Sequence, residues 1–501
     1  MKSEWMITLL TAGGILILCT AMIIWDKIRQ RKWFLRHLKQ RWGTIPDREY
    51  TQEELESISH YARRHEGEPF MIDDITWNDL QMDEIFIRMN NTLSSCGEDV
   101  LYQMLRQPQM HREVLEERER LIAYFQTHEE ERIQVLTRVK EVKKIWKMSI
   151  ADYIDALKDV DRTGRAKYPM LAGLSVAAII ATLIKPIPCM FLLLLMLCVS
   201  AVVHTRDSKK IEPYLNCFVC ILRLLRAADQ FEKLDNPVIQ TYLDRIREGR
   251  KKMKSFRRGA FLVASTNSVQ DGLEAIVVSY LRIIFQVDFI KFYSMLKHVE
   301  GNEAIIEDMY QAIGELDALI AVASFRESLP YYSLPEFTET DNAEGASLEV
   351  EELYHPLIAD PVVNGIRMQR GVLITGSNAS GKSTFLKTIA INTILAQTVH
   401  TCIAKQHRGS FLKVLTSMAL RDNLAGGESY YMVEIRSLKR ILEECEKPER
   451  YYVSWMRFFA ERTRSSELPH PRRFFILWQT ESPCDGGNAR YRTVLYPGKR
   501  V

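Results

Sequence analysis

The sequence predicts an α/β P-loop nucleotide-binding domain near the C-terminus, preceded by a mostly α-helical region with an N-terminal transmembrane helix and a transmembrane helical hairpin. Three observations predict this class: a glycine-rich loop between a strand and a helix, long uncharged apolar runs, and amphipathic helical spacing between them. The 501 residues are enough for several domains, and a net charge of +3 gives no argument for nucleic acid. Cys217 and Cys220 form the one CxxC pair, in an apolar helical context that favours core packing over metal or redox chemistry.

Residues 1–26 are predicted to form a transmembrane anchor. The segment Trp5–Trp25 has 21 residues without a charge, which can span about 30 Å of hydrocarbon. A cleaved signal peptide is the alternative, but the run is long, few charges precede it and no small-residue cleavage site follows. Residues 27–70 form a juxtamembrane segment that begins with a strongly basic run. The positive-inside rule therefore places the rest of the chain in the cytoplasm of a plasma-membrane (cell inner membrane) protein.

Residues 168–204 are predicted to form a transmembrane hairpin, broken only by Lys185-Pro-Ile-Pro188. Basic residues flank both outer ends of this block, namely Arg162, Arg165, Lys167, Arg206, Lys209 and Lys210. An in–out–in hairpin fits that charge pattern and is favoured over a buried core hairpin. The chain would then be a multi-pass protein with three transmembrane segments, and the membrane would be its first partner.

Amphipathic helical patterns occupy the regions on either side of the hairpin, residues 71–165 and 210–334. The basic stretch Arg247–Gly259 lies in the second region. It is interpreted as a solvated helix face in preference to a phosphate-binding patch, because Phe256 is the one aromatic residue within it. A change to short alternating runs and turn residues marks a domain boundary near Leu334.

Residues 335–447 are predicted to form the nucleotide-binding domain. A strand at Val372–Thr375 leads into Gly376-Ser377-Asn378-Ala379-Ser380-Gly381-Lys382-Ser383-Thr384 and then into an amphipathic helix, which is the context that the pattern GxxxxGK[ST] requires. The glycines let backbone N–H groups surround phosphate oxygens at the helix N-terminus. Lys382 would reach the β- and γ-phosphates and Ser383 would bind Mg²⁺. The cofactors predicted are ATP and Mg²⁺.

The residues around this loop resemble the ATPase domain of the MutS family of DNA mismatch repair proteins. That family combines a GPNMGGKST loop with a downstream (D)LxxGxSxFMxE segment, matched here by Asp422, Leu424, Gly427, Ser429, Met432 and Glu434. The resemblance covers about Asp73–Glu446 outside the hairpin and includes Tyr354-His355-Pro356, which is similar to a His-Pro element preceding the nucleotide site.

The resemblance implies an ATPase that is active as a homodimer and that has DNA as a possible partner. Ser429, Met432 and Glu434 would face the nucleotide of the second subunit, and Asn378 and Lys382 would hold the phosphates. His355 would lie beside the same nucleotide.

The N-terminal half departs from the family. A membrane anchor stands where the mismatch-reading domain is expected, and the Phe-x-Glu sequence at Phe337–Glu339 is interpreted as structural. Direct recognition of mismatches is therefore not expected. The alternative function is an ABC-like nucleotide-driven membrane switch, or a transport or signalling component, that does not bind DNA; a non-catalytic scaffold is a third.

The tail, residues 448–501, lacks the acidic strand that the family places after the segment ending at Glu446. That strand would carry the Asp-Glu pair for Mg²⁺ and water near Val453–Arg457, so this chain is predicted to contain no catalytic residue of its own.

The codons of Trp455-Met456, TGG ATG, read GAT (Asp) in the shifted frame, and permitted codons from Val453 can continue as FVDEVLRGTNTVERIAAS. We interpret the tail as frameshifted near codon 448 and again near codon 482, in preference to natural divergence. The chain is then expected to fold poorly past Glu446 and to hydrolyse ATP feebly.

Overall fold

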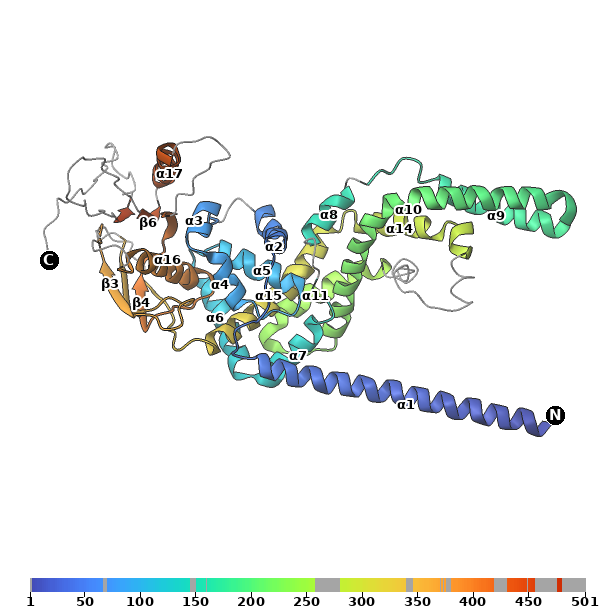
Figure 1. Ribbon diagram of the computed structural model, residues 1–501, viewed down its shortest axis with the longest axis horizontal. Coiled ribbons are helices and arrows are strands. Elements are labelled where there is room, and N and C mark those ends of the chain that lie inside the picture. The colour runs from blue at the N-terminus through green and yellow to red at the C-terminus, as the bar shows by residue number, and fades with distance from the viewer. Residues whose placement is uncertain are drawn as a thin grey trace, which may run out of the picture.

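The computed structural model describes residues 2–65, 70–144, 150–158, 160–256, 280–338, 346–369, 371–372, 374, 380–418, 430–447, 449–455 and 475–479. Helices dominate up to residue 327, and the sheets follow. The predicted order, a helical region and then an α/β region, is confirmed at this level. The sheets lie at one end of an elongated molecule, and the helical region extends from them to the other end (Figure 1).

The helical region consists of one long N-terminal helix, a central bundle and a projecting hairpin. Its helices are α1 (Lys2–Arg41), α2 (Gln52–Arg64), α3 (Asp74–Asp79), α4 (Met82–Met89), α5 (Ser95–Arg106), α6 (Arg112–Thr127), α7 (Glu129–Val139), α8 (Ile150–Lys158), α9 (Lys167–Ile184), α10 (Pro186–Phe231), α11 (Gln240–Lys252), α14 (Val287–Val299) and α15 (Glu303–Glu327), with short 3₁₀ turns at Pro237–Ile239 and Met253–Ser255. Cys217 and Cys220 are buried in α10, so their interpretation as core residues holds.

Helix α15 is the centre of the bundle and packs closely on α5. A Cβ atom at Gly314 would lie 2.5 Å from the carbonyl oxygen of Cys96, so only glycine allows this approach. The buried carboxylate of Asp317 caps the start of α5, because it accepts hydrogen bonds from the backbone N–H groups of Leu93 and Ser94 and from Ser94 Oγ. Burial raises the pKa of Asp317 to about 6 despite these hydrogen bonds.

Two helices among the described residues are long and apolar enough to cross a membrane. They are Lys167–Ile184, with mean hydropathy 1.6, and Pro186–Ile211, with mean hydropathy 2.5, and they form the hairpin of α9 and α10. The second has only 6% of its apolar window buried, unlike the core helix of a soluble protein. Transmembrane insertion of the hairpin, and of residues 1–26 within α1, stays a prediction.

The C-terminal region contains two small sheets. The first has the order β1-β4-β2-β3, from β1 (Glu336–Phe337), β4 (Gln406–Gly409), β2 (Leu348–Leu353) and β3 (Asn364–Met368), with β1 parallel to β4 and the other pairs antiparallel. The second has the order β5-β6-β7, from β5 (Lys413–Ser417), β6 (Arg450–Trp455) and β7 (Phe475–Gln479). Here β5 and β6 are parallel, and β7 is antiparallel to β6.

Two expectations about strands need correction. The strand predicted at Val372–Thr375 is not assigned: Val372 and Ile374 pack against the core but belong to no strand, and residues 373 and 375 lie outside the described part. The expectation that order is lost past Glu446 is wrong for Arg450–Trp455. Its buried aromatic and β-branched residues extend the sheet beside β5, although no acidic pair follows.

Candidate nucleotide-binding site

The described half of the glycine-rich loop leads directly into helix α16 (Lys382–Thr398). Gly381 is the N-cap and has a left-handed φ of +81°, which favours glycine. Lys382 is only 6% exposed, and its Nζ donates a hydrogen bond of 2.9 Å to Ser380 Oγ. An ammonium group held beside a helix N-terminus suits the phosphates of a nucleotide, so these residues fit the predicted ATP site.

The predicted site residues are only partly within the described structure. Ser380, Gly381, Lys382, Ser383 and Thr384 lie together at the start of α16. The predicted residues Gly376, Ser377, Asn378, Ala379 and Ser429 lie outside the described residues. Met432 and Glu434 lie in the first part of α17 (Tyr430–Cys445), where only the backbone is described. The predicted role of the Ser429–Glu434 segment in a second subunit's site therefore stays a prediction.

His355 lies near the same helix but is largely enclosed. It is 9% exposed, and its Nδ1 accepts a 3.3 Å hydrogen bond from the backbone N–H of Leu357. Burial, followed by the positive charge of Lys387 on α16, lowers the pKa of His355. A neutral His355 suits contact with an uncharged part of a nucleotide better than contact with phosphate.

The opposite end of α16 is held by basic side chains of the helical region. Arg118 of α6 donates to the carbonyl of Thr398, and Arg326 of α15 donates to that of His400 at 3.0 Å. Positive charge at this end complements the helix dipole. Glu119 joins the cluster, lying 2.5 Å from Arg326 and 3.3 Å from His400.

Glu119 is held ionised by these partners. Burial alone would raise the pKa of Glu119, but hydrogen bonds from His400 and Arg326 bring it down to about 2. Arg118, Glu119 and Arg326 were not predicted from the sequence. Arg118 and Glu119 belong to a charged pattern on α6 that looks like an ordinary solvated helix face, and Arg326 is a single basic residue in the last turn of α15, so no sequence signal distinguishes them.

Helix α3 of the helical region holds the C-terminal end of β5. Asp79 is buried, and its carboxylate accepts hydrogen bonds from Thr416 Oγ1 at 2.8 Å and from the backbone N–H of Met418 at 2.7 Å. Arg440 of α17 donates to the carbonyl of Thr416 at 2.5 Å and pairs with Asp73, the N-cap of α3. Helix α17, which contains Met432 and Glu434 of the predicted second-subunit segment, is therefore attached to the helical region.

The described end of β6 carries no carboxylate. Ser454 and Trp455 lie opposite Thr416 and Ser417 in the parallel register, where the family's acidic pair is expected. Within the described residues, no cluster of three or more His, Cys, Asp or Glu side chains could hold a metal ion. Ser383, the predicted Mg²⁺ ligand, lies within the described residues at the start of α16.

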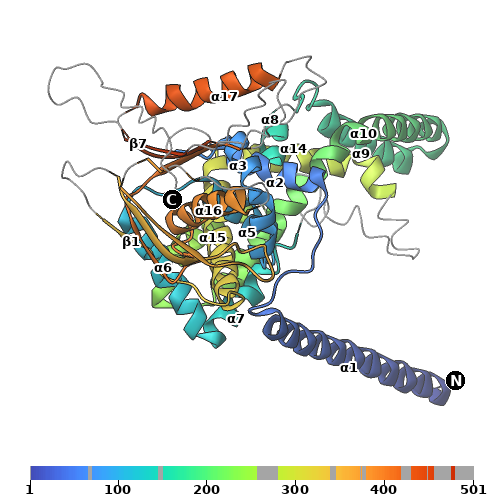
Figure 2. The ribbon, with the colours of Figure 1, turned by 60° about the vertical axis from the view of Figure 1, so that its left-hand side comes forward.

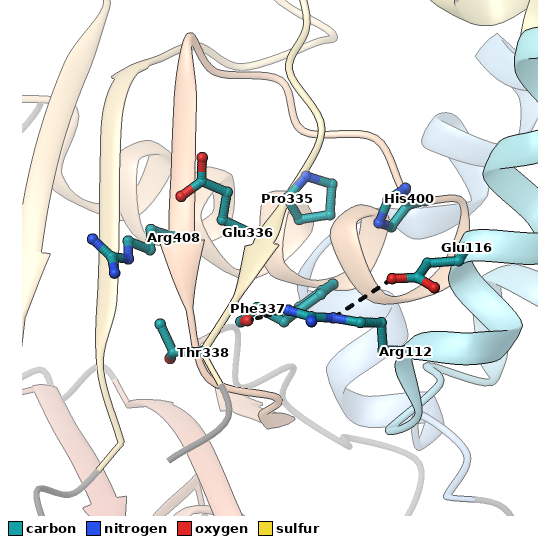
Figure 3. A pocket seen from close by; sticks show the side chains of 8 residues that line it. All are labelled: Arg112, Glu116, Pro335, Glu336, Phe337, Thr338, His400 and Arg408. Atoms are coloured by element: carbon teal, nitrogen blue, oxygen red, sulfur yellow. Dashed lines mark hydrogen bonds and ion pairs between the residues drawn. The ribbon is translucent and has the colours of Figure 1, made fainter.

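A separate cavity of about 550 Å³ opens between α6 and the first sheet (Figure 3). It is lined by Arg112, Glu116, Pro335, Glu336, Phe337, Thr338, His400 and Arg408. Arg112 crosses its floor and donates a 2.6 Å hydrogen bond to the carbonyl of Phe337. Phe337 is 5% exposed and stacks on Phe411 at 4.1 Å between ring centroids, so its predicted structural role is confirmed.

The described sheets and the start of α16 fit the class of P-loop-type α/β domains, here attached to a helical region. Residues 372–449 match the family model MutS domain V. The chain is therefore MutS-related in this region.

Similar proteins agree with that assignment. "DNA mismatch repair protein msh3" of Aspergillus fumigatus is 30% identical over 164 residues, which are 31% of this chain and 14% of that protein. "DNA mismatch repair protein MutS 1" of Halobacterium salinarum is 30% identical over 158 residues, 30% of this chain and 18% of that protein. MutS of Haloquadratum walsbyi is 32% identical over 167 residues, 32% of this chain and 17% of that protein. The chain thus spans less than a fifth of the length of these relatives.

Proposed function

We propose that this chain is a membrane-anchored, MutS-related ATP-binding protein whose nucleotide state acts on DNA or on a protein partner through the helical region. The observation that carries the proposal is Lys382, buried at the N-terminus of α16 beside the left-handed Gly381, within the region that matches MutS domain V. Bound ATP would supply the phosphate-transfer chemistry. Lys382 would hold its phosphates, Ser383 would bind Mg²⁺, and a second copy of the chain would contribute Ser429, Met432 and Glu434.

Nucleotide binding tests this proposal directly. Lys382→Ala removes the charge that holds the phosphates, so affinity for a fluorescent ATP analogue is expected to fall about 10- to 100-fold. Lys439→Ala, on the exposed face of α17, is the matched control and should bind like the unmodified chain. Equal affinity of the Lys382 variant and the control would exclude this loop as the binding site.

Hydrolysis is proposed to be weak in this chain because the reading frame changes near codon 448, just before strand β6. The domain V match stops at residue 449, and β6 pairs in register with β5 up to Trp455 without acidic residues at its end. Replacing residues 454–471 by FVDEVLRGTNTVERIAAS should raise ATP hydrolysis at least about tenfold. The nucleotide sequence is the more direct test: if codons 453–471 cannot encode this peptide, the frameshift explanation is wrong.

The second candidate is a nucleotide-driven membrane switch, or a transport or signalling component, that does not bind DNA. The observation that favours it is the apolar hairpin, which projects from the bundle with most of its side chains exposed. Binding of the full chain in detergent to labelled duplex DNA at increasing salt separates the two functions. Binding that weakens steeply with salt supports the DNA partner, and no binding at low salt supports the switch.

A further inference from the structure

Two apolar elements that are far apart in the sequence extend from the helical bundle toward the same side of the molecule. In both views, the N-terminal part of α1 and the hairpin of α9 and α10 extend away from the bundle on the side opposite the two sheets (Figures 1 and 2). At about 1.5 Å per residue, the 21-residue segment Trp5–Trp25 is about 31 Å long and the 18-residue α9 is about 27 Å long. One bilayer can therefore accommodate both elements.

Helix α1 is fixed to the bundle only by its last turns. Leu38 is 8% exposed, and Phe34 and Trp42 pack against the core. Arg132 lies 3.5 Å from the centre of the Trp42 ring, and Lys39 pairs with Glu129 at 2.6 Å. Before Phe34, all described side chains of α1 are exposed. The apolar part of α1 therefore leaves the bundle in one direction.

The hairpin is fixed at its base by a buried carboxylate. Asp207 is 3% exposed and accepts hydrogen bonds from Lys167 Nζ at 2.5 Å and from Tyr168 OH at 3.0 Å. The ring of Tyr168 stacks on Phe289 of α14 at 4.5 Å between centroids. Both apolar elements are thus attached to the same bundle, which sets their relative position.

Cations gather where each element leaves the bundle. Residues 27–41 contain seven Lys and Arg and no Asp or Glu. Arg29, Arg31 and Lys32 are exposed, and none of them forms an ion pair with another described residue. The same is true of three residues at the base of the hairpin, namely Arg165, Arg206 and Lys209.

Acidic residues near these cations are already engaged. Asp26 accepts a hydrogen bond from Gln30, and the carboxylate of Asp161 accepts hydrogen bonds from Thr163. Asp207 is bound to Lys167 and Lys210. The six exposed cations therefore face solvent without neutralising partners from the described residues.

We propose that Arg29, Arg31, Lys32, Arg165, Arg206 and Lys209 form one cationic collar that binds the headgroups of anionic phospholipids. The collar rests on the proposed membrane anchoring, because the inserted helices would bring these side chains to the level of the headgroups. Phosphate oxygens of anionic lipids accept hydrogen bonds from guanidinium and ammonium groups, and the surface potential attracts each cation. The sheets and the nucleotide site would then lie at the end of the molecule far from the membrane.

Lipid retention tests the collar with the full chain. The protein, purified in detergent, is equilibrated with micelles of equal phosphatidylcholine and phosphatidylglycerol and captured, and the retained phospholipids are quantified. The retained ratio of phosphatidylglycerol to phosphatidylcholine should exceed the bulk ratio at least about fivefold and approach it in 1 M salt. A retained ratio equal to the bulk ratio at low salt would overturn the proposal.

Three variants locate the binding. Arg29→Gln/Arg31→Gln/Lys32→Gln and Arg165→Gln/Arg206→Gln/Lys209→Gln should each reduce the enrichment. The matched control, Arg367→Gln/Arg408→Gln/Lys439→Gln, changes three exposed cations of the sheet region and should retain it. If only one of the two collar variants reduces the enrichment of phosphatidylglycerol, or if the control reduces it equally, a single collar is contradicted. All variants should melt at the temperature of the unmodified chain, since each replaced side chain is exposed.

Carbonate extraction separates failure of the collar from failure of the anchor. If the unmodified chain stays in the membrane fraction but shows no enrichment, the collar is wrong and the anchor is kept. If carbonate releases the chain, the proposed anchoring is wrong, and the collar, which depends on the anchoring, is wrong as well.

Discussion

At the scale of single residues, the buried cluster around Arg326 is the strongest polar feature of the described structure. Arg326 contacts Glu119 through both terminal nitrogens, at 3.0 and 2.5 Å, and its Nε donates to Thr401 Oγ1 at 2.8 Å. Its side chain is 1% exposed. Removing one partner of such a pair leaves an uncompensated buried charge, which is costly because the low-dielectric interior cannot solvate it.

Arg326→Met is expected to lower the free energy of unfolding by about 3–5 kcal/mol, as measured by urea denaturation. Arg120→Met is the control, because Arg120 is half-exposed and its pair with Glu117 is worth at most about 1 kcal/mol. A loss below about 1 kcal/mol for the Arg326 variant would show that the cluster does not stabilise the fold.

His407 of β4 makes stability depend on pH. It is 1% exposed, neither ring nitrogen has a hydrogen-bond partner among the described residues, and burial lowers its pKa to about 4. The unfolded chain, with an ordinary histidine pKa of about 6.5, takes up the proton first as the pH falls. The contribution of neutral His407 is therefore complete above pH 6.5 and is lost as the pH falls toward 4.

Between pH 7 and pH 5, this effect should lower the free energy of unfolding by about 2 kcal/mol. His407→Leu removes the titrating group, so its stability should change by about 2 kcal/mol less over the same interval. Urea denaturation at both pH values measures the difference. Identical pH dependence of the two proteins would show that His407 does not titrate as described.

Single residues also show which parts of the site could be predicted. The glycine-rich pattern around Gly381 and Lys382 was sufficient to predict this part of the site. The left-handed Gly381 and the buried Lys382 lie next to each other in the sequence, so a local pattern can identify them. Arg326 could not be found, because its partner Glu119 lies 207 positions earlier and the contact depends on how α6, α15 and α16 pack. A local pattern carries no information about such a contact.

At the scale of elements, helix α3 joins the helical region to the second sheet. Asp79 binds the last residues of β5, and Asp73 pairs with Arg440 of α17. The helices were predictable from their apolar spacing. Strand β6 was not, because its end carries no acidic residue of the kind expected there, whereas the strand forms through the pairing of Tyr451–Val453 with β5.

Asp79→Ala should leave the backbone N–H of Met418 buried without its acceptor. The expected cost is about 2–3 kcal/mol, and amide hydrogen exchange of Lys413–Ser417 should become faster than in the unmodified chain. Asp244→Ala is the control, since Asp244 is an exposed residue of α11. Unchanged exchange in β5 would show that α3 does not hold this strand.

At the scale of the whole molecule, the hairpin has a tip that the proposed in–out–in arrangement places on the outer side of the membrane. Lys185 lies at this tip between α9 and α10. In a variant with Cys19, Cys189 and Cys198 replaced by Ser, Lys185→Cys should react with a membrane-impermeant maleimide added to intact cells. Lys254→Cys, in the bundle, should react only after permeabilisation. Labelling of Lys185→Cys only after permeabilisation would place the hairpin tip inside the cell.

Helix α16 also has a mechanical consequence. It is 17 residues long, or about 25 Å, and a residue with left-handed φ lies just beyond each end: Gly381 at +81° and His400 at +51°. The backbone conformation of these two residues ends the helix on both sides. A displacement of α16 at its Gly381 end would therefore be passed to the end held by Arg118 and Arg326, where the helical region contacts it.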